Sequence, residues 1–162
     1  MSSTAPSSIQ AEGIAVGGAS GWDIRIRRTD GSVPGSRSHP VLHAATLPLP
    51  ERRGDFGGEV VQAMGARDAF IALLEYGAES VGTALFSWPG VPRPLDARWF
   101  RANQLERTIA GQVGLQRFFT EQGRAFSLYV VLGAAAHATG LVDRVNAFLS
   151  RLLILPVPGG AG

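Results

Sequence analysis

Three histidines are the side chains best suited to acid–base or metal chemistry in this chain: His39, His43 and His137. A spacing of four, as between His39 and His43, brings two ring nitrogens to one metal ion on a helix. Here Pro40 lies between them in an extended context, where four residues separate the side chains by roughly 13 Å. We therefore expect His39 at a loop edge, a partly buried and hydrogen-bonded His43, and a turn or capping role for His137.

Carboxylates and nucleophiles form no recognisable catalytic set. No G-x-S-x-G elbow surrounds a serine, and the lack of cysteine excludes disulfides, thiolate zinc sites and a cysteine nucleophile. Glu75 and Glu79 flank the end of a predicted strand, where we expect solvated turn carboxylates. The sequence therefore predicts no catalytic residue, no cofactor-binding residue, no metal site and no cofactor. An enzyme of unrecognised type, using His43 with Glu75, stays open as an alternative.

A glycine-rich stretch at residues 17–21 follows a possible strand, as a phosphate-binding loop would. It lacks both the G-x-G-x-x-G spacing and a GK[ST] ending. A strand pattern follows it, instead of a helix whose N-terminus faces an anion. We therefore interpret this stretch as a turn.

The basic residues argue against nucleic-acid binding. All fifteen are arginine, the net charge is only +2, and the arginines are scattered from Arg25 to Arg151. Nucleic-acid recognition needs cations clustered where they face phosphates. We expect no nucleic-acid partner, and we attribute the all-arginine composition to a GC-rich coding sequence.

An aromatic, proline-rich segment and one strand face are the candidate partner-binding surfaces. Three prolines in residues 88–94 prevent a regular element there and predict a surface loop, pinned by Trp88 and Trp99. Arginines on the solvent-exposed face of a strand at 22–28 suit an acidic partner or a phosphate. They equally suit a charged sheet surface that keeps the exposed strand from pairing with another chain. The partner-binding hypothesis therefore names Trp88, Val91, Arg93, Trp99, Arg25 and Arg27.

Residues 115–132 form the predicted centre of the fold. Two runs rich in aromatic and aliphatic residues flank Glu121-Gln122-Gly123-Arg124. A glycine in such a short polar break favours a tight β-hairpin turn with positive φ. The second run, 125–132, is apolar at nearly every position, which is typical of a strand covered on both faces. We therefore predict a hairpin whose second arm is a central strand.

Hydrophobic periodicity predicts the remaining elements. Strands are expected at 9–16, 22–28, 41–47, 69–77 and 153–157, a short helix at 58–65, and an extended segment at 107–113 that leads into the hairpin. The terminal helix is expected from Thr139 or Gly140 to about Leu152, with Thr139 as its N-cap and an apolar stripe along one side.

Length and composition suit a single α+β domain. A chain of 162 residues is long enough to bury roughly 70% of its unfolded surface without disulfides. We predict a disordered tail at 1–8, one globular domain at 9–157 and a Gly/Pro-rich tail or linker at 158–162. The expected architecture is an α/β/α-type sandwich, in which a C-terminal amphipathic helix and a further short helix cover a central, mainly antiparallel sheet.

The hydropathy pattern predicts a cytoplasmic protein. At the N-terminus no basic region precedes an apolar run, so we expect no signal peptide. No apolar stretch reaches the ~18 residues that span a bilayer, so we expect no transmembrane segment.

The order of these elements carries a resemblance. Gly21-Trp22 opens an alternating strand, a later strand ends in Leu47-Pro48 and Leu49-Pro50, and an amphipathic helix after the hairpin precedes a short last strand. This pattern looks like the Mog1/PsbP-like fold, over residues 9–157. The resemblance implies an antiparallel sheet with helices on both sides, and a scaffold that binds other proteins. Members include a small-GTPase regulator, photosystem accessory subunits and bacterial cell-envelope lipoproteins, and no catalytic residues carry over.

The sequence is compatible with three functions. The first is a non-catalytic protein-binding module or accessory subunit of a larger assembly, with a protein partner or a homo-oligomer. The second is a small-molecule or lipid carrier, with a pocket between sheet and helix that Phe118, Phe126, Tyr129 or Phe148 lines. The third is the unrecognised enzyme.

Overall fold

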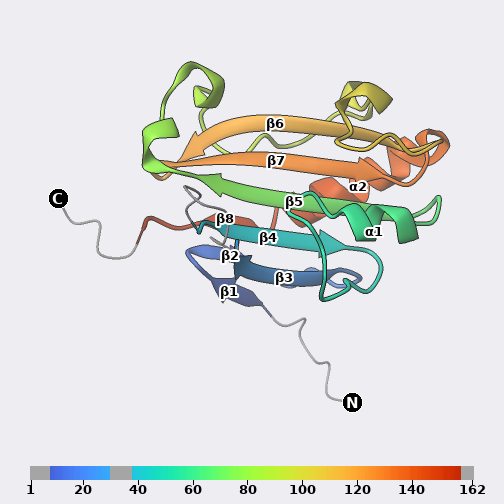
Figure 1. The fold of residues 1–162 in the computed structure, drawn as a ribbon, viewed down its shortest axis with the longest axis horizontal. Helices are drawn as coiled ribbons and strands as arrows, with labels where there is room; N and C mark the ends of the chain where they lie inside the picture. Colours follow the sequence, from blue (N-terminus) through green and yellow to red (C-terminus); the bar gives the residue numbers. More distant parts are fainter. Residues whose placement is uncertain (1–7, 30–37, 158–162) are drawn as a thin grey trace, which may run out of the picture.

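A computed structural model describes residues 8–29 and 38–157 of the chain (Figure 1). The strands are β1 (Ile9–Ala11), β2 (Ile14–Val16), β3 (Asp23–Arg28), β4 (Pro40–Ala45), β5 (Ala69–Tyr76), β6 (Val113–Glu121), β7 (Arg124–Leu132) and β8 (Leu152–Ile154). The helices are α1 (Gly58–Ala63) and α2 (Ala138–Leu149). Single-turn 3-10 helices are η1 (Ala78–Ser80), η2 (Ala84–Phe86), η3 (Ala97–Trp99), η4 (Ala102–Gln104) and η5 (Ala135–His137). The tails predicted at 1–8 and 158–162 fall, apart from Ser8, outside the described residues.

The larger sheet is antiparallel throughout, in the order β3-β4-β5-β7-β6. Its longest pairing is the predicted hairpin, in which the chain reverses at Gln122 and Gly123 between β6 and β7. Both turn residues have positive φ, 55° and 68°, as the tight two-residue turns of β-hairpins require. All nine residues of β7 are buried, as expected of an interior strand, although β5 occupies the middle of the sheet.

The smaller sheet, β1-β2-β8, joins the two ends of the described chain. The single strand predicted at 9–16 is wrong, because Glu12 and Gly13, with φ of 55° and 72°, reverse the chain between β1 and β2. β8 pairs with the other side of β2, for example through Ile14 and Ile154. This sheet lies next to β3, which β1 contacts (Figure 1).

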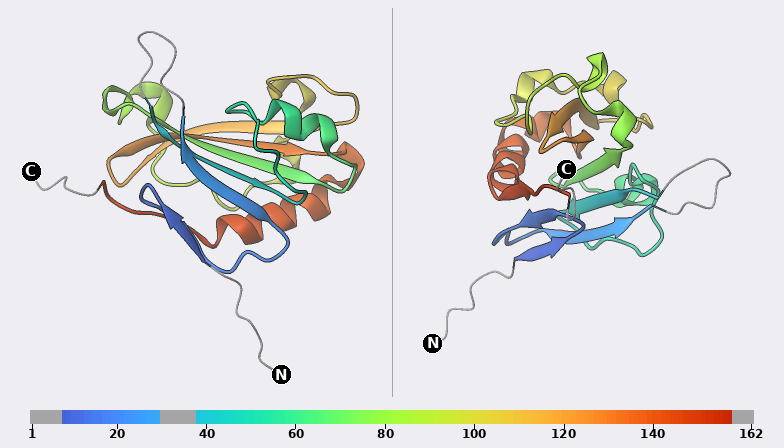
Figure 2. Two further views of the ribbon diagram at one scale, coloured as in Figure 1. Left: turned by 60° about the horizontal axis from the view of Figure 1, so that its bottom comes forward. Right: turned by 90° about the vertical axis from the view of Figure 1, so that its left-hand side faces the viewer.

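Helices cover both faces of the larger sheet (Figure 2). α2 lies along one face and buries its apolar stripe, including Phe148, in a core shared with Leu128 of β7. On the opposite face, Val60 of α1 lies in a second core with Tyr129 of β7. Successive residues of one strand therefore supply both cores, which explains why β5 and β7 are apolar at nearly every position. This arrangement confirms the predicted α+β fold with its antiparallel sheet.

Several predicted boundaries differ from the structure. α2 ends at Leu149 instead of near Leu152, and the last strand spans Leu152–Ile154 instead of 153–157. Residues 107–112 do not form a strand, because the chain is irregular there and β6 begins at Val113. α2 begins at Ala138, so Thr139 lies inside its first turn and His137 holds the N-cap position without a side-chain hydrogen bond. The reason is that η5 runs directly into α2, as 3-10 turns often do at helix N-termini.

Candidate binding groove

The long connection from β5 to β6 crosses the outer edge of β6 at two points. At one crossing, the Thr120 N–H donates to the Trp88 carbonyl at 2.9 Å and the Gly90 N–H donates to the Thr120 carbonyl at 2.8 Å. At the other, Arg101 and Gly114 exchange backbone hydrogen bonds of 2.9 and 3.0 Å. The connection therefore frames the edge of β6 at both ends.

A cavity of about 630 Å³ lies along this framed edge. We call it the tryptophan groove, and its lining residues are Leu85, Trp88, Pro89, Val91, Pro92, Arg93, Pro94, Trp99, Gln116, Arg117 and Phe118. Leu85, Trp88 and Trp99 are 59%, 61% and 42% exposed, and they are three of the five exposed large hydrophobic side chains among the described residues. Exposed apolar surface is therefore concentrated at this groove, which is typical of a binding site.

The wall of the groove is anchored to α2 and the strand that follows it. The Arg93 guanidinium donates to the carbonyls of Leu149 and Leu152, the second at 2.8 Å. The Asn146 side chain accepts from the Leu95 N–H at 2.7 Å and donates to the Leu95 carbonyl at 2.9 Å. These bonds and the burial of neighbouring apolar side chains hold the wall in place, so the groove is formed before any ligand binds.

Positive charge prevails inside the groove. Arg93 and Arg117 are its two charged lining residues, and no carboxylate lines it. The Arg117 guanidinium stacks over the Trp99 ring, 5.7 Å from the ring centroid. Beside this wall, the Arg98 guanidinium lowers the pKa of Asp96 to about 2, so that carboxylate is already matched by its own cation.

The bare edge of β6 forms part of the groove. Along an antiparallel strand, backbone groups point alternately toward the paired strand and away from it. Gly114 and Thr120 point outward, and so does Phe118 by the same alternation. Between the two crossings, Gln104 Oε1 accepts from the Gln116 N–H at 3.1 Å. Over the described part of the chain, the N–H and carbonyl of Phe118 have no hydrogen-bond partner.

The structure places four of the six residues of the partner-binding hypothesis at one cavity. Trp88, Val91, Arg93 and Trp99 all line the tryptophan groove. The two strand arginines lie elsewhere, because β3 and β6 are opposite edges of the larger sheet. Arg25 is paired with Asp23 at 3.1 Å, and Arg27 donates to the Arg53 carbonyl at 2.8 Å. One partner surface therefore does not include both sets.

Sequence reasoning missed the groove residues contributed by β6. Gln116 and Arg117 lie in the predicted hairpin and were not named as site residues, and Phe118 was named only for a carrier pocket between sheet and helix. The signal available was their position in the first arm, whose residues are less uniformly apolar than those of the second. That pattern is typical of an edge strand.

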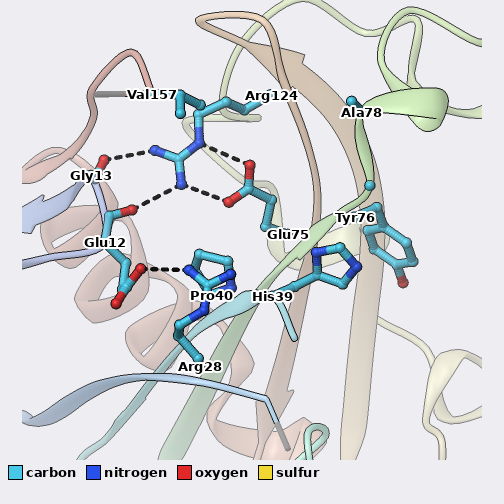
Figure 3. Close-up of a pocket in the computed structure, with 11 residues that line it drawn as sticks. Glu12, Gly13, Arg28, His39, Pro40, Glu75, Tyr76, Ala78, Arg124 and Val157 are labelled. Atoms are coloured by element: carbon cyan, nitrogen blue, oxygen red, sulfur yellow. Dashed lines mark hydrogen bonds and ion pairs between the residues drawn. The ribbon is translucent and has the colours of Figure 1, made fainter. Parts of the chain in front are cut away.

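A second cavity, of about 430 Å³, surrounds the guanidinium of Arg124 (Figure 3). Two of its N–H groups reach the Glu75 carboxylate, at 2.9 and 2.6 Å. The other three donate to the carbonyls of Glu12, Gly13 and Leu155, at 2.9 to 3.0 Å. All five donors of the guanidinium are therefore occupied by the protein itself. The Glu12 carboxylate is likewise matched, by Arg28 at 2.7 Å.

This cluster corrects the prediction for Glu75. Its side chain is only 13% exposed and ion-paired, whereas a solvated turn carboxylate was expected. The ion pair forms because the hairpin of β6 and β7 places Arg124 two residues from Phe126, which is opposite Glu75 in the register of β5 and β7. Glu79 is exposed, as expected.

His43 is fully buried on β4, on the face of the sheet covered by α1. Its Nδ1 accepts from Arg53 Nε at 2.9 Å, so Nε2 carries the proton and donates to the Asp55 carbonyl at 2.8 Å. Burial is the main reason that the pKa of His43 is lowered to about 4. The charges of Arg53 and Arg27 lower this pKa further, and the hydrogen bond to the Asp55 carbonyl raises it in part. Glu75 lies on the same face of β5 as Leu73, which belongs to the core beneath α2, whereas His43 lies on the other face of the sheet. The suggested pairing of His43 with Glu75 is therefore wrong.

The carrier pocket suggested by the sequence does not assemble either. Phe126 and Phe148 are fully buried in the core beneath α2, whereas Tyr129 is buried in the core on the other face. Phe118 lines the tryptophan groove, and Phe148 lines a separate small cavity of about 140 Å³ beside Trp22, so these two residues do not share a pocket.

The described residues contain neither a helix suited to spanning a membrane nor a metal-binding cluster. Within residues 8–29 and 38–157, no helix combines the length and the hydrophobicity that crossing a bilayer requires. The same ranges contain no group of three His, Cys, Asp or Glu side chains placed to hold a metal ion. Comparison with known proteins finds no matching family model, curated protein or solved structure.

Proposed function

We propose that the chain is a non-catalytic protein-binding module that takes a segment of a partner protein into the tryptophan groove, as an accessory subunit of a larger assembly. The observation that carries this proposal is the presence of two exposed tryptophans, Trp88 and Trp99, on one anchored groove. Tryptophan and arginine are the residues most enriched among those that dominate protein interfaces. The resemblance to the Mog1/PsbP-like scaffold, which implies protein binding, points in the same direction.

The buried ionisable groups support binding rather than catalysis. Both ring nitrogens of His43 are occupied, and its pKa of about 4 is far from the value that suits a general base at neutral pH. The guanidinium of Arg124 has no donor left for a substrate. The groups that the fold brings together are therefore committed to one another.

The test begins with affinity capture and ends with a measured affinity. A captured partner is identified, purified and titrated against the chain by calorimetry. We expect the double variant Trp88→Ala/Trp99→Ala to weaken this binding at least about thirtyfold, the effect of losing one dominant interface residue. The control is Leu153→Ala, which removes a 54% exposed leucine of β8 whose side chain does not line the groove.

Two outcomes reject the proposal. One is an unchanged affinity in the double variant, with its unfolding midpoint also unchanged. The other is a small molecule that stays bound through purification, detected by native mass spectrometry and lost in the double variant. The groove volume of about 630 Å³ lies within the range of small-molecule pockets, so this second outcome would support the carrier function instead.

A further inference from the structure

We infer that the segment bound in the tryptophan groove is an extended, acidic stretch of a partner protein that adds to the edge of β6 at Phe118. This inference rests on the proposed function and names the chemistry of its partner. Three features of the groove carry it: an unpaired backbone edge, two exposed tryptophan rings and an uncompensated arginine.

The backbone at Phe118 sets the form of the segment. Its N–H and carbonyl both point away from β7, and neither has a partner among the described residues. An extended peptide satisfies such a pair with one N–H and one carbonyl of its own, as in other cases of strand addition to a sheet edge. A helical segment cannot do this, because its backbone N–H and carbonyl groups bond to each other within the helix.

The two crossings of the connection limit the length of this pairing. Gly114 and Thr120, where the edge is already bonded, are separated by about 20 Å of strand. The Gln104 side chain occupies the Gln116 N–H inside this interval. Only one pair of backbone hydrogen bonds is therefore open, so side chains must provide most of the affinity.

The groove walls define those side chains. Residues of an extended segment alternate in direction, so its side chains reach both sides of the groove, which the exposed rings of Trp88 and Trp99 help to line. Apolar residues and proline suit these rings, because they bury ring surface without leaving a polar group unpaired.

The charge of the groove selects an acidic segment. Arg117 uses Nη1 for the carbonyl of Gln116 at 3.0 Å and for the Gln104 side chain, while its Nε and Nη2 have no partner in the portion of the chain described. These two atoms form the side of the guanidinium that binds a carboxylate through two parallel hydrogen bonds. No lining carboxylate competes for them. A basic segment would meet two like charges, Arg93 and Arg117.

The experiment uses synthetic peptides of about eight residues, long enough to span the open edge at ~3.3 Å per residue. Three peptides carry valine, leucine or proline at alternate positions and differ at the intervening positions, which are Glu in the first, Gln in the second and Lys in the third. A fourth peptide has the sequence of the Glu peptide with its central residues N-methylated. Binding is measured by fluorescence polarisation at low and at moderate salt, and the amide signal of Phe118 is followed by NMR.

The expected results distinguish charge-dependent binding from nonspecific hydrophobic binding. The Glu peptide binds about tenfold more tightly than the Lys peptide, and Arg117→Gln removes this difference. Arg117→Lys keeps part of it, because the charge remains and the guanidinium fork is lost. Arg67→Gln, which removes an exposed arginine outside the groove, leaves it unchanged. N-methylation weakens the Glu peptide, and the Phe118 amide signal shifts only with peptides that bind.

Several results would overturn the inference. Equal or tighter binding of the Lys peptide excludes the acidic segment, and undiminished binding of the N-methylated peptide excludes pairing at Phe118. Self-association of the chain that Trp88→Ala abolishes would assign the groove to a second copy. If no peptide binds while a natural partner still depends on both tryptophans, the inference fails and the proposed function stands. If that dependence is also absent, both fail.

Discussion

Arg124 of β7 and Glu75 of β5 form a two-pronged ion pair, with Nη2–Oε1 and Nε–Oε2 distances of 2.6 and 2.9 Å, in which the arginine is only 3% exposed. The same guanidinium holds the carbonyls of Glu12 and Gly13 in one β-hairpin turn and that of Leu155 after β8. One side chain therefore fastens the smaller sheet to the larger one.

We predict that Arg124→Met lowers the free energy of unfolding by about 3–5 kcal/mol. The reason is that Glu75 keeps its burial without a countercharge, and three carbonyls each lose a hydrogen bond. Urea unfolding of the variant measures the loss. The double variant Arg124→Met/Glu75→Leu should recover part of it, because no unpaired charge then remains.

The control for this prediction is Arg25→Met. It breaks an ion pair with Asp23 whose arginine side chain is 57% exposed, so we expect it to cost less than about 1 kcal/mol. Equal costs for Arg124→Met and Arg25→Met would contradict the role given to Arg124.

His43 makes the stability of the fold depend on pH. Its pKa is about 4 in the folded chain and 6.5 in the unfolded one, so the unfolded chain takes up a proton first as the pH falls. Stability is therefore full above pH 6.5 and decreases toward pH 4. Between pH 7 and pH 5 we expect a loss of about 2 kcal/mol in the free energy of unfolding, measured by urea titrations at each pH.

The variant His43→Gln should remove this pH dependence, whatever its own stability. His137→Gln, at a half-buried position before α2, is the matched control and should retain the dependence. A slope that survives in His43→Gln would assign it to another group.

Gly57 is required at its position, whereas Gly54 in the same loop is not. Gly57 has a φ of 66°, and a Cβ there would overlap the ring of Phe70. We expect Gly57→Ala to cost about 3 kcal/mol, from left-handed strain and from displacement of the ring. No heavy atom lies within 4 Å of a Cβ at Gly54, so Gly54→Ala should stay within about 0.5 kcal/mol. Thermal unfolding of both variants makes the comparison, and similar midpoints would contradict it.

Trp88 should contribute little to stability. It is 61% exposed, so Trp88→Ala is expected to change the free energy of unfolding by less than about 0.5 kcal/mol. Trp22 packs against Phe148 of α2 in a tilted arrangement, 5.1 Å between ring centroids, so Trp22→Ala should cost more than about 1 kcal/mol. Denaturant unfolding of the two variants tests this order, and a larger cost for Trp88→Ala would show that the ring is structural.

The central hairpin was predictable because its signals are local. Gly123 stands in a short polar break, and apolar residues fill both arms, so turn and strands are encoded within a few residues of each other. The reversal at Glu12 and Gly13 has the same backbone form, but β1 and β2 have only three residues each, too few to show the alternating pattern that marks two strands.

The burial of Arg124 and the open backbone groups of Phe118 were not predictable for a different reason. The carbonyls that Arg124 binds belong to Glu12, Gly13 and Leu155, which are far from it in the chain. The open backbone of Phe118 depends on the order of the strands in the sheet. Both are properties of the tertiary arrangement, which hydrophobic periodicity and composition do not determine.

The pairing of β2 with β8 has a consequence for how the chain folds. Ile14 and Ile154 are neighbours in the smaller sheet, although nearly the whole chain separates them. Contacts between such distant residues lose much chain entropy before they form, and they slow folding. During synthesis, β1 and β2 emerge first and form only a two-stranded hairpin, which is marginally stable in water, until β8 follows. We therefore expect closure of the smaller sheet to come last in folding and to limit its rate.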